Sequence, residues 1–93
     1  RLARRVGLGL ARTGSVAHHG SGEIFVAMAN GLRRCGCGGP AITGKALDTY
    51  FGAVVDATEE AVIASLIHAT TTTGYQGRTI QALPLDEVRG MLP

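Results

Sequence analysis

The chain has 93 residues, a formal net charge of +2, and 45% hydrophobic against 17% charged residues. This length allows one domain or part of one, and the small net charge gives no support for a nucleic-acid or membrane partner. No apolar run reaches the roughly 20 residues of a membrane-spanning helix, and no secretory signal is visible, which favours a cytoplasmic location.

Residues 1–12 predict an amphipathic helix, because apolar residues recur at every fourth position and the arginines form a largely solvated face. The apolar positions are Leu2, Val6 and Leu10. Gly7 and Gly9 weaken a helix by about 1 kcal/mol each relative to alanine, so they indicate that another element packs closely there. Gly14 predicts the end of the helix, and a loop follows over residues 15–20.

Residues 23–29 are the best strand candidate, because they are apolar on both faces, as in a strand covered on both sides. Ser21 and Glu23 stand at its entry. Alternate residues of an extended backbone share a face, so this hydroxyl and this carboxyl are expected side by side. Such a triplet is also common in polar turns, and the pair alone does not establish catalysis.

Residues 31–45 contain five glycines, one proline and both cysteines of the chain, which predicts a loop. Cys35 and Cys37 are expected to be reduced thiols on its surface. Two cysteines separated by Gly36 exclude a disulfide-rich secreted fold.

Residues 47–70 have the strongest helical periodicity in the chain, with a break at Gly52 left open. Four β-branched residues at 70–73 disfavour its continuation. A turn is expected over 74–77.

A short strand is predicted over 78–83, and a terminal helix over 85–91. The predicted fold class is α+β.

Other side chains offer weaker sites. One is a catalytic triad in which Ser21 is the nucleophile, His18 or His19 is the base and Asp48 orients the base. The sequence has no nucleophile-elbow motif to support this triad. The histidines and cysteines have no standard zinc-site spacing, so we expect no metal and no cofactor. The possible ligands are His18, His19, His68, Cys35 and Cys37.

Three stretches in this order resemble the C-terminal part of the L-aminopeptidase/D-esterase family, which includes the β-peptidyl aminopeptidases. They are LGLARTGS (8–15), GSGEIF (20–25), and TEEAV (58–62) together with TTG (72–74), GRT (77–79) and ALPLD (82–86). The resemblance covers nearly the whole chain except residues 31–46.

The resemblance implies a precursor that cleaves itself into two chains and frees a nucleophilic serine at the start of the smaller one. It implies a four-layer αββα sandwich, an N-terminal-nucleophile-like fold shared with the ornithine acetyltransferases. Ser21 and Glu23 match the family's Ser-x-Glu pair. Ser21 would then hydrogen-bond the nucleophile, and Glu23 would hold the network and the substrate's amino terminus.

The chain departs from the family pattern at several places. The family's nucleophilic serine lies upstream of the helix at which this chain begins, so no residue here is assigned to it. Ser15 is not a substitute, because it follows the helix-ending pattern. Ala64 stands where an asparagine is expected, and the loop around Gly36 has no counterpart.

The resemblance therefore implies that residues 1–93 are a single partial domain, the C-terminal segment of the smaller chain. Its parent would release N-terminal amino acids from short peptides, amides or esters through an acyl-enzyme. Its partners would be the larger chain of the same precursor and further copies in a homo-oligomer. Alone, the segment would be inactive. The alternative is a non-catalytic remnant or interaction subunit that retains the fold.

Overall fold

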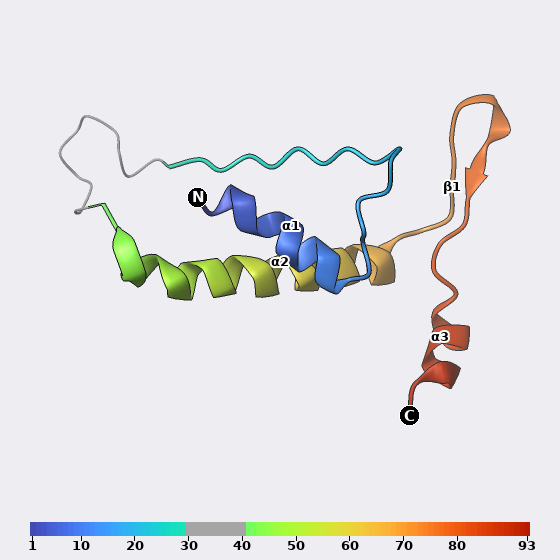
Figure 1. Cartoon of the computed structure of the whole chain (residues 1–93). Helices are drawn as coiled ribbons and strands as arrows, with labels where there is room; N and C mark the ends of the chain where they lie inside the picture. The colour runs from blue at the N-terminus through green and yellow to red at the C-terminus, as the bar shows by residue number, and fades with distance from the viewer. Residues whose placement is uncertain (30–40) are drawn as a thin grey trace. The chain divides into compact units, whose positions relative to one another are not determined.

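The computed structural model describes residues 1–29 and 41–93 (Figure 1). Within them the chain is a small α+β protein with three α-helices and a two-stranded sheet. It divides into two compact units, Arg1–Glu59 and Glu60–Pro93, which are described separately. The predicted thiols Cys35 and Cys37, and most of the predicted loop, lie outside the described residues.

The first unit begins with helix α1 (Ala3–Arg12), as the apolar spacing predicts. The helix ends at Arg12, and the chain turns away at Gly14, whose φ of +95° is a conformation that glycine adopts without strain. The hydroxyl of Thr13 donates to the carbonyl of Leu10 at 2.7 Å, which satisfies one of the last free carbonyls.

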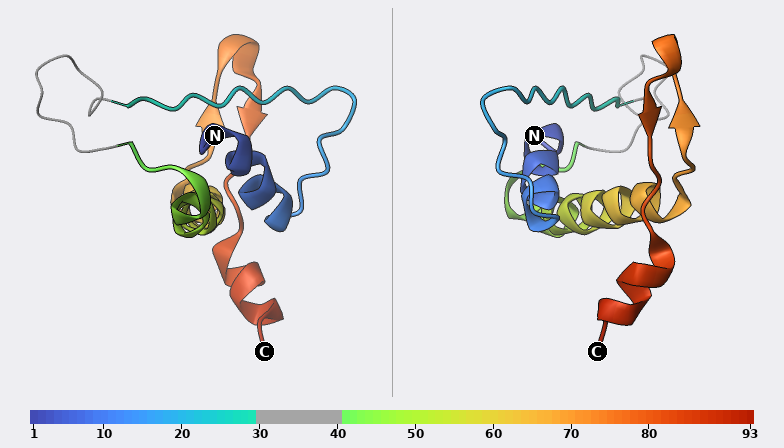
Figure 2. Two further views of the ribbon diagram at one scale, coloured as in Figure 1. Left: turned by 60° about the vertical axis from the view of Figure 1, so that its left-hand side comes forward. Right: turned by 90° about the vertical axis from the view of Figure 1, so that its right-hand side faces the viewer.

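Helix α2 (Asp48–His68) follows a short 3-10 helix at Gly44–Leu47 and runs through Gly52 without a break. The first part of α2 lies beside α1 in each view (Figures 1 and 2). Gly9 is buried at this contact. A Cβ atom there would lie 2.5 Å from the carbonyl oxygen of Val55 and 2.6 Å from Cβ of Thr58. The predicted close approach at Gly9 is confirmed.

Residues 21–29 follow an extended course but form no strand, so the strand predicted over 23–29 is wrong (Figure 1). The only strands among the described residues are β1 and β2, which pair with each other. Within residues 1–29 and 41–93 the segment therefore has no neighbour for its ladder hydrogen bonds. Its side chains are also uncovered, with Ile24 at 91%, Val26 at 80% and Met28 at 95% exposure.

The second unit contains the hairpin of β1 (Thr72–Thr73) and β2 (Thr79–Ile80), joined by a 3-10 turn at Tyr75–Gly77. The strands are antiparallel, and Thr72 pairs with Ile80. The strand predicted over 78–83 is thus only two residues long. Beyond it, the N–H of Ala82 donates to the hydroxyl of Thr71 at 3.0 Å, which replaces a backbone ladder bond.

Helix α3 (Leu85–Met91) has the bounds that the sequence predicts. None of the helices in residues 1–29 and 41–93 combines the length and hydrophobicity needed to cross a membrane. No hydrophobic side chain is fully buried in these same ranges. The described part of the chain thus has helices with apolar faces but no closed core of its own.

Candidate active site

The Ser21 hydroxyl donates a hydrogen bond to the carboxylate of Glu23. The backbone N–H of Ser21 donates to the carbonyl of His18 at 2.7 Å, so a tight turn precedes the extended segment. The expected side-by-side presentation of hydroxyl and carboxyl is therefore present. Both residues are exposed, and their catalytic role stays a prediction.

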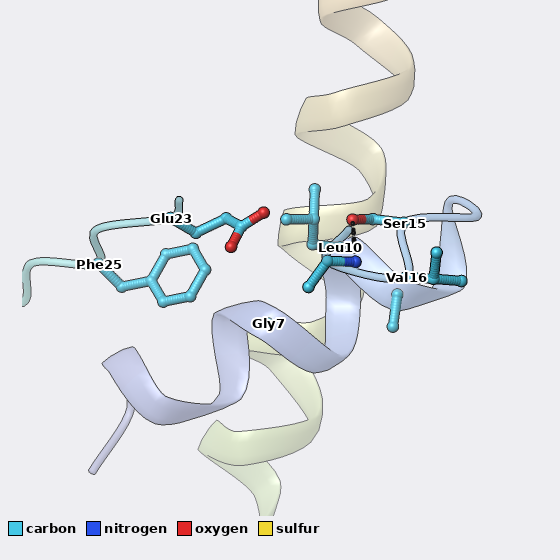
Figure 3. A pocket seen from close by; sticks show the side chains of 8 residues that line it. Gly7, Leu10, Ser15, Val16, Glu23 and Phe25 are labelled. Carbon is cyan, nitrogen blue, oxygen red and sulfur yellow. Dashed lines mark hydrogen bonds between the residues drawn. The ribbon is translucent and has the colours of Figure 1, made fainter. Parts of the chain in front are cut away.

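A cavity of about 310 Å³ lies between α1 and the extended segment (Figure 3). Its lining residues are Gly7, Leu10, Ala11, Ser15, Val16, Ala17, Glu23 and Phe25. Among these described lining residues, only Glu23 carries an ionisable side chain. Glu23 and Phe25 point toward α1, as their alternate positions on an extended backbone require (Figure 3).

The sequence does not predict this cavity, although it contains two features that contribute to it. Phe25 shares a face with Glu23, and Gly7 marks a helix surface without a side chain. A Cβ atom at Gly7 would lie 3.7 Å from Cε2 of Phe25, an ordinary van der Waals distance. The alternation of residues 23 and 25 along the extended segment and the glycine at position 7 of the helix were the sequence features that could have indicated this cavity.

Arg12 joins the end of α1 to two carboxylates of α2. Its guanidinium lies 2.6 Å from Oδ1 of Asp56 and 2.7 Å from Oε2 of Glu59. The hydrogen bond to Asp56, followed by the charge of Glu59, raises the pKa of Arg12 above its ordinary value. This pairing corrects the expectation that the arginines of the helix are merely solvated.

A second arginine contact lies nearer the start of α1. The guanidinium carbon of Arg5 is 3.8 Å from the ring centre of Phe51, and that of Arg1 is 5.3 Å from it. Cations at these distances are attracted by the aromatic face. Together with Arg12, they hold both ends of α1 against α2.

The weaker candidate sites are not assembled from the side chains that the structure describes. Among residues 1–29 and 41–93, no hydrogen bond joins Ser21 to His19 or Asp48, and no group of three metal-ligating side chains occurs. His68 bonds through Nδ1 to the carbonyl of Ala64 at 2.8 Å, within α2. Ala64 itself is half-buried on that helix.

The sequence profile of Peptidase family S58 matches residues 1–80, and the chain belongs to this family. It is 40% identical over 98 residues to a beta-peptidyl aminopeptidase BapA of Sphingosinicella microcystinivorans, covering 99% of this chain and 25% of that protein. It is 34% identical over 96 residues to a beta-peptidyl aminopeptidase BapA of Sphingosinicella xenopeptidilytica, covering 95% of this chain and 24% of that protein. No solved structure matches.

These matches confirm the family resemblance that the sequence predicts. The chain spans about a quarter of the length of the two curated relatives.

Proposed function

We propose that this chain is the C-terminal segment of the smaller chain of a self-cleaving serine aminopeptidase. The observation that carries the proposal is the hydrogen-bonded Ser21–Glu23 pair at the wall of a cavity. It occurs in a chain of which 99% aligns with a beta-peptidyl aminopeptidase.

In the proposed reaction, a serine outside residues 1–93 attacks the carbonyl carbon of the substrate's N-terminal residue. The serine's proton passes to its own α-amino group and from there to the leaving amine. An acyl-serine remains, and water hydrolyses it to regenerate the enzyme. The hydroxyl of Ser21 hydrogen-bonds the nucleophile and keeps its oxygen oriented.

Glu23 supplies the charge that an aminopeptidase needs to select a free amino terminus. A carboxylate pairs with the substrate's ammonium group, and a charge-assisted bond of this kind is stronger than a neutral one. Within the described residues, Glu23 accepts from Ser21 and forms no ion pair with a cation. The proposal assigns this charge to the substrate's ammonium group.

The proposal includes a larger chain of the same precursor and the four-layer αββα sandwich. The support is the uncovered extended segment 21–29, where Ile24 and Met28 are almost fully exposed. Unpaired backbone groups and apolar side chains of this kind require a covering sheet and helix layer. A homo-oligomer and a cytoplasmic location belong to the same proposal.

The alternative is a non-catalytic remnant or interaction subunit that retains the fold. Its support is that no nucleophile is assigned within residues 1–93 and that Ala64 replaces an expected asparagine. An upstream reading frame with a Gly-Ser-like cleavage site favours the enzyme. A start codon just before Arg1 favours the remnant.

A hybrid protein tests the proposal. In it, this chain replaces the matched quarter of the Sphingosinicella microcystinivorans relative. We expect the hybrid to release p-nitroaniline from alanyl or β-alanyl p-nitroanilide, and the isolated chain to release none. A hybrid that assembles without activity contradicts the proposal. So does a hybrid that fails to assemble where the relative itself assembles.

A further inference from the structure

We propose that the cavity beside Glu23 holds the aliphatic side chain of the substrate's N-terminal residue and so selects which residues are released. This inference rests on the function proposed above. It assigns a new role to Gly7 and Leu10 on α1 and to Phe25 on the extended segment.

The charge distribution of the cavity fits an aliphatic amine. Glu23 is the one ionisable side chain among the described residues that line it. Leu10, Val16 and Phe25 offer apolar surface within the same cavity. A ligand with an ammonium group next to an aliphatic chain meets both features at once, because its charge pairs with the carboxylate while its chain leaves water.

The size of the cavity favours a small occupant. Its volume of about 310 Å³ stands at the lower end of the roughly 300–1,000 Å³ of ligand pockets. That space suits one amino-acid side chain with its ammonium group.

The floor of the cavity is held in place by its contacts with α2. Gly9, two residues from Gly7, packs directly against Val55 and Thr58. Arg12 pairs with Asp56 at 2.6 Å at the end of the same helix. A cavity can select substrate side chains by shape only if its floor is rigid, and these contacts with α2 make the α1 floor rigid.

A protein segment from the rest of the precursor is the competing occupant. Packing an apolar segment there would cover the carboxylate of Glu23 without a cation, which is unfavourable. A substrate ammonium group compensates that charge. The charge of Glu23 therefore favours a substrate over a core segment.

Gly7→Leu in the hybrid protein tests the inference, because a side chain at this position projects toward Phe25 across the cavity. Gly52→Leu is the matched control, since Gly52 is also helical and has no heavy atom near its would-be Cβ atom. The substrates are p-nitroanilides of the accepted α- or β-amino acids, with side chains that grow from hydrogen to isobutyl.

We expect Gly7→Leu to lower kcat/KM for the isobutyl substrate about tenfold or more relative to the substrate without a side chain, since one methylene changes selectivity by this order. Gly52→Leu should leave that ratio unchanged. Phe25→Ala should shift the ratio toward larger side chains. A general structural defect would lower the rates on all substrates together and leave the ratios unchanged.

Three results overturn the inference in distinguishable ways. Equal losses on every substrate in a Gly7→Leu hybrid that assembles normally show that the cavity does not select side chains. Loss of assembly in Gly7→Leu, with normal assembly in Gly52→Leu, shows that a protein segment fills the cavity. An unsubstituted hybrid that assembles but hydrolyses no substrate removes the proposed function itself.

Discussion

Gly9 is the residue at which α1 comes closest to α2. Its would-be Cβ atom meets the backbone oxygen of Val55 at 2.5 Å, and a backbone atom cannot move aside as a flexible side chain does. The sequence could indicate this approach because a glycine inside an amphipathic helix is unfavourable unless something packs against it.

We predict that Gly9→Ala destabilises the hybrid protein by about 1–3 kcal/mol, the usual range for overpacking a close contact. Gly52→Ala in α2 meets no atom within 4 Å and should instead stabilise it by up to about 1 kcal/mol through helix propensity. Urea denaturation of both variants measures the difference. Equal stability of the two variants would show that α1 does not lie this close to α2.

The helices of this chain could be predicted from their own residues, whereas a strand could not. Helices α1, α2 and α3 were predicted within about two residues of their bounds, because periodicity and helix-ending residues lie within each segment. The segment 23–29 has an equally clear apolar pattern, yet it forms no strand. A strand depends on a neighbour distant in sequence, and the described residues supply none for this segment.

The contacts between elements could not be predicted in the same way. Arg12 and Asp56 lie 44 positions apart, and nothing in either segment specifies the other. The Ser21–Glu23 pair was predictable because only two positions separate its members. The cavity beside it was not, since it depends on how α1 and the extended segment pack together.

At the level of the helix pair, we predict that Arg12→Gln lowers the melting temperature of the hybrid protein by a few degrees at low salt. The reason is that glutamine loses the charge that pairs with Asp56 and Glu59. The difference from the parent should shrink near 1 M salt, where the Debye length falls to about 3 Å.

Arg89→Gln is the matched control for the ion pair. Arg89 contacts Asp86 at 3.3 Å within α3, and both side chains are largely exposed. Such pairs contribute little to stability, so the melting temperature should stay near that of the parent. The assignment of Arg12 as a link between helices fails if both variants melt alike at every salt concentration.

For the molecule as a whole, the main feature is the amount of apolar surface left uncovered. Ile24, Val26 and Met28 are at least 80% exposed, and no hydrophobic side chain among the described residues is fully buried. A chain without a closed core lacks the main stabilising contribution to cooperative folding.

We therefore predict that the isolated 93-residue chain unfolds gradually on heating, without a sharp transition in circular dichroism at 222 nm. It should also bind a hydrophobic dye strongly. The hybrid protein, in which the remaining layers cover the same surfaces, should show a cooperative transition and weak dye binding. A sharp transition in the isolated chain would mean that it closes its own core and needs no larger chain.

In the proposed aminopeptidase site, Glu23 binds the amino terminus of the substrate. This binding is measured by comparing kcat/KM for alanyl p-nitroanilide and for propionyl p-nitroanilide, which lacks the amino group, in the hybrid protein and its Glu23→Gln variant. Where the hybrid accepts only β-amino acids, β-alanyl p-nitroanilide replaces the alanyl substrate, and propionyl p-nitroanilide remains the analogue without an amino group. Glu60→Gln, at an exposed position of α2, is the control.

We predict that Glu23→Gln lowers kcat/KM for the amine substrate by about 30-fold or more, the loss typical of removing one partner of a desolvated charge pair. The preference for the amine over its deaminated analogue should fall by a similar factor. Glu60→Gln should behave as the parent. An unchanged preference in the Glu23→Gln variant would show that Glu23 does not bind the amino terminus of the substrate.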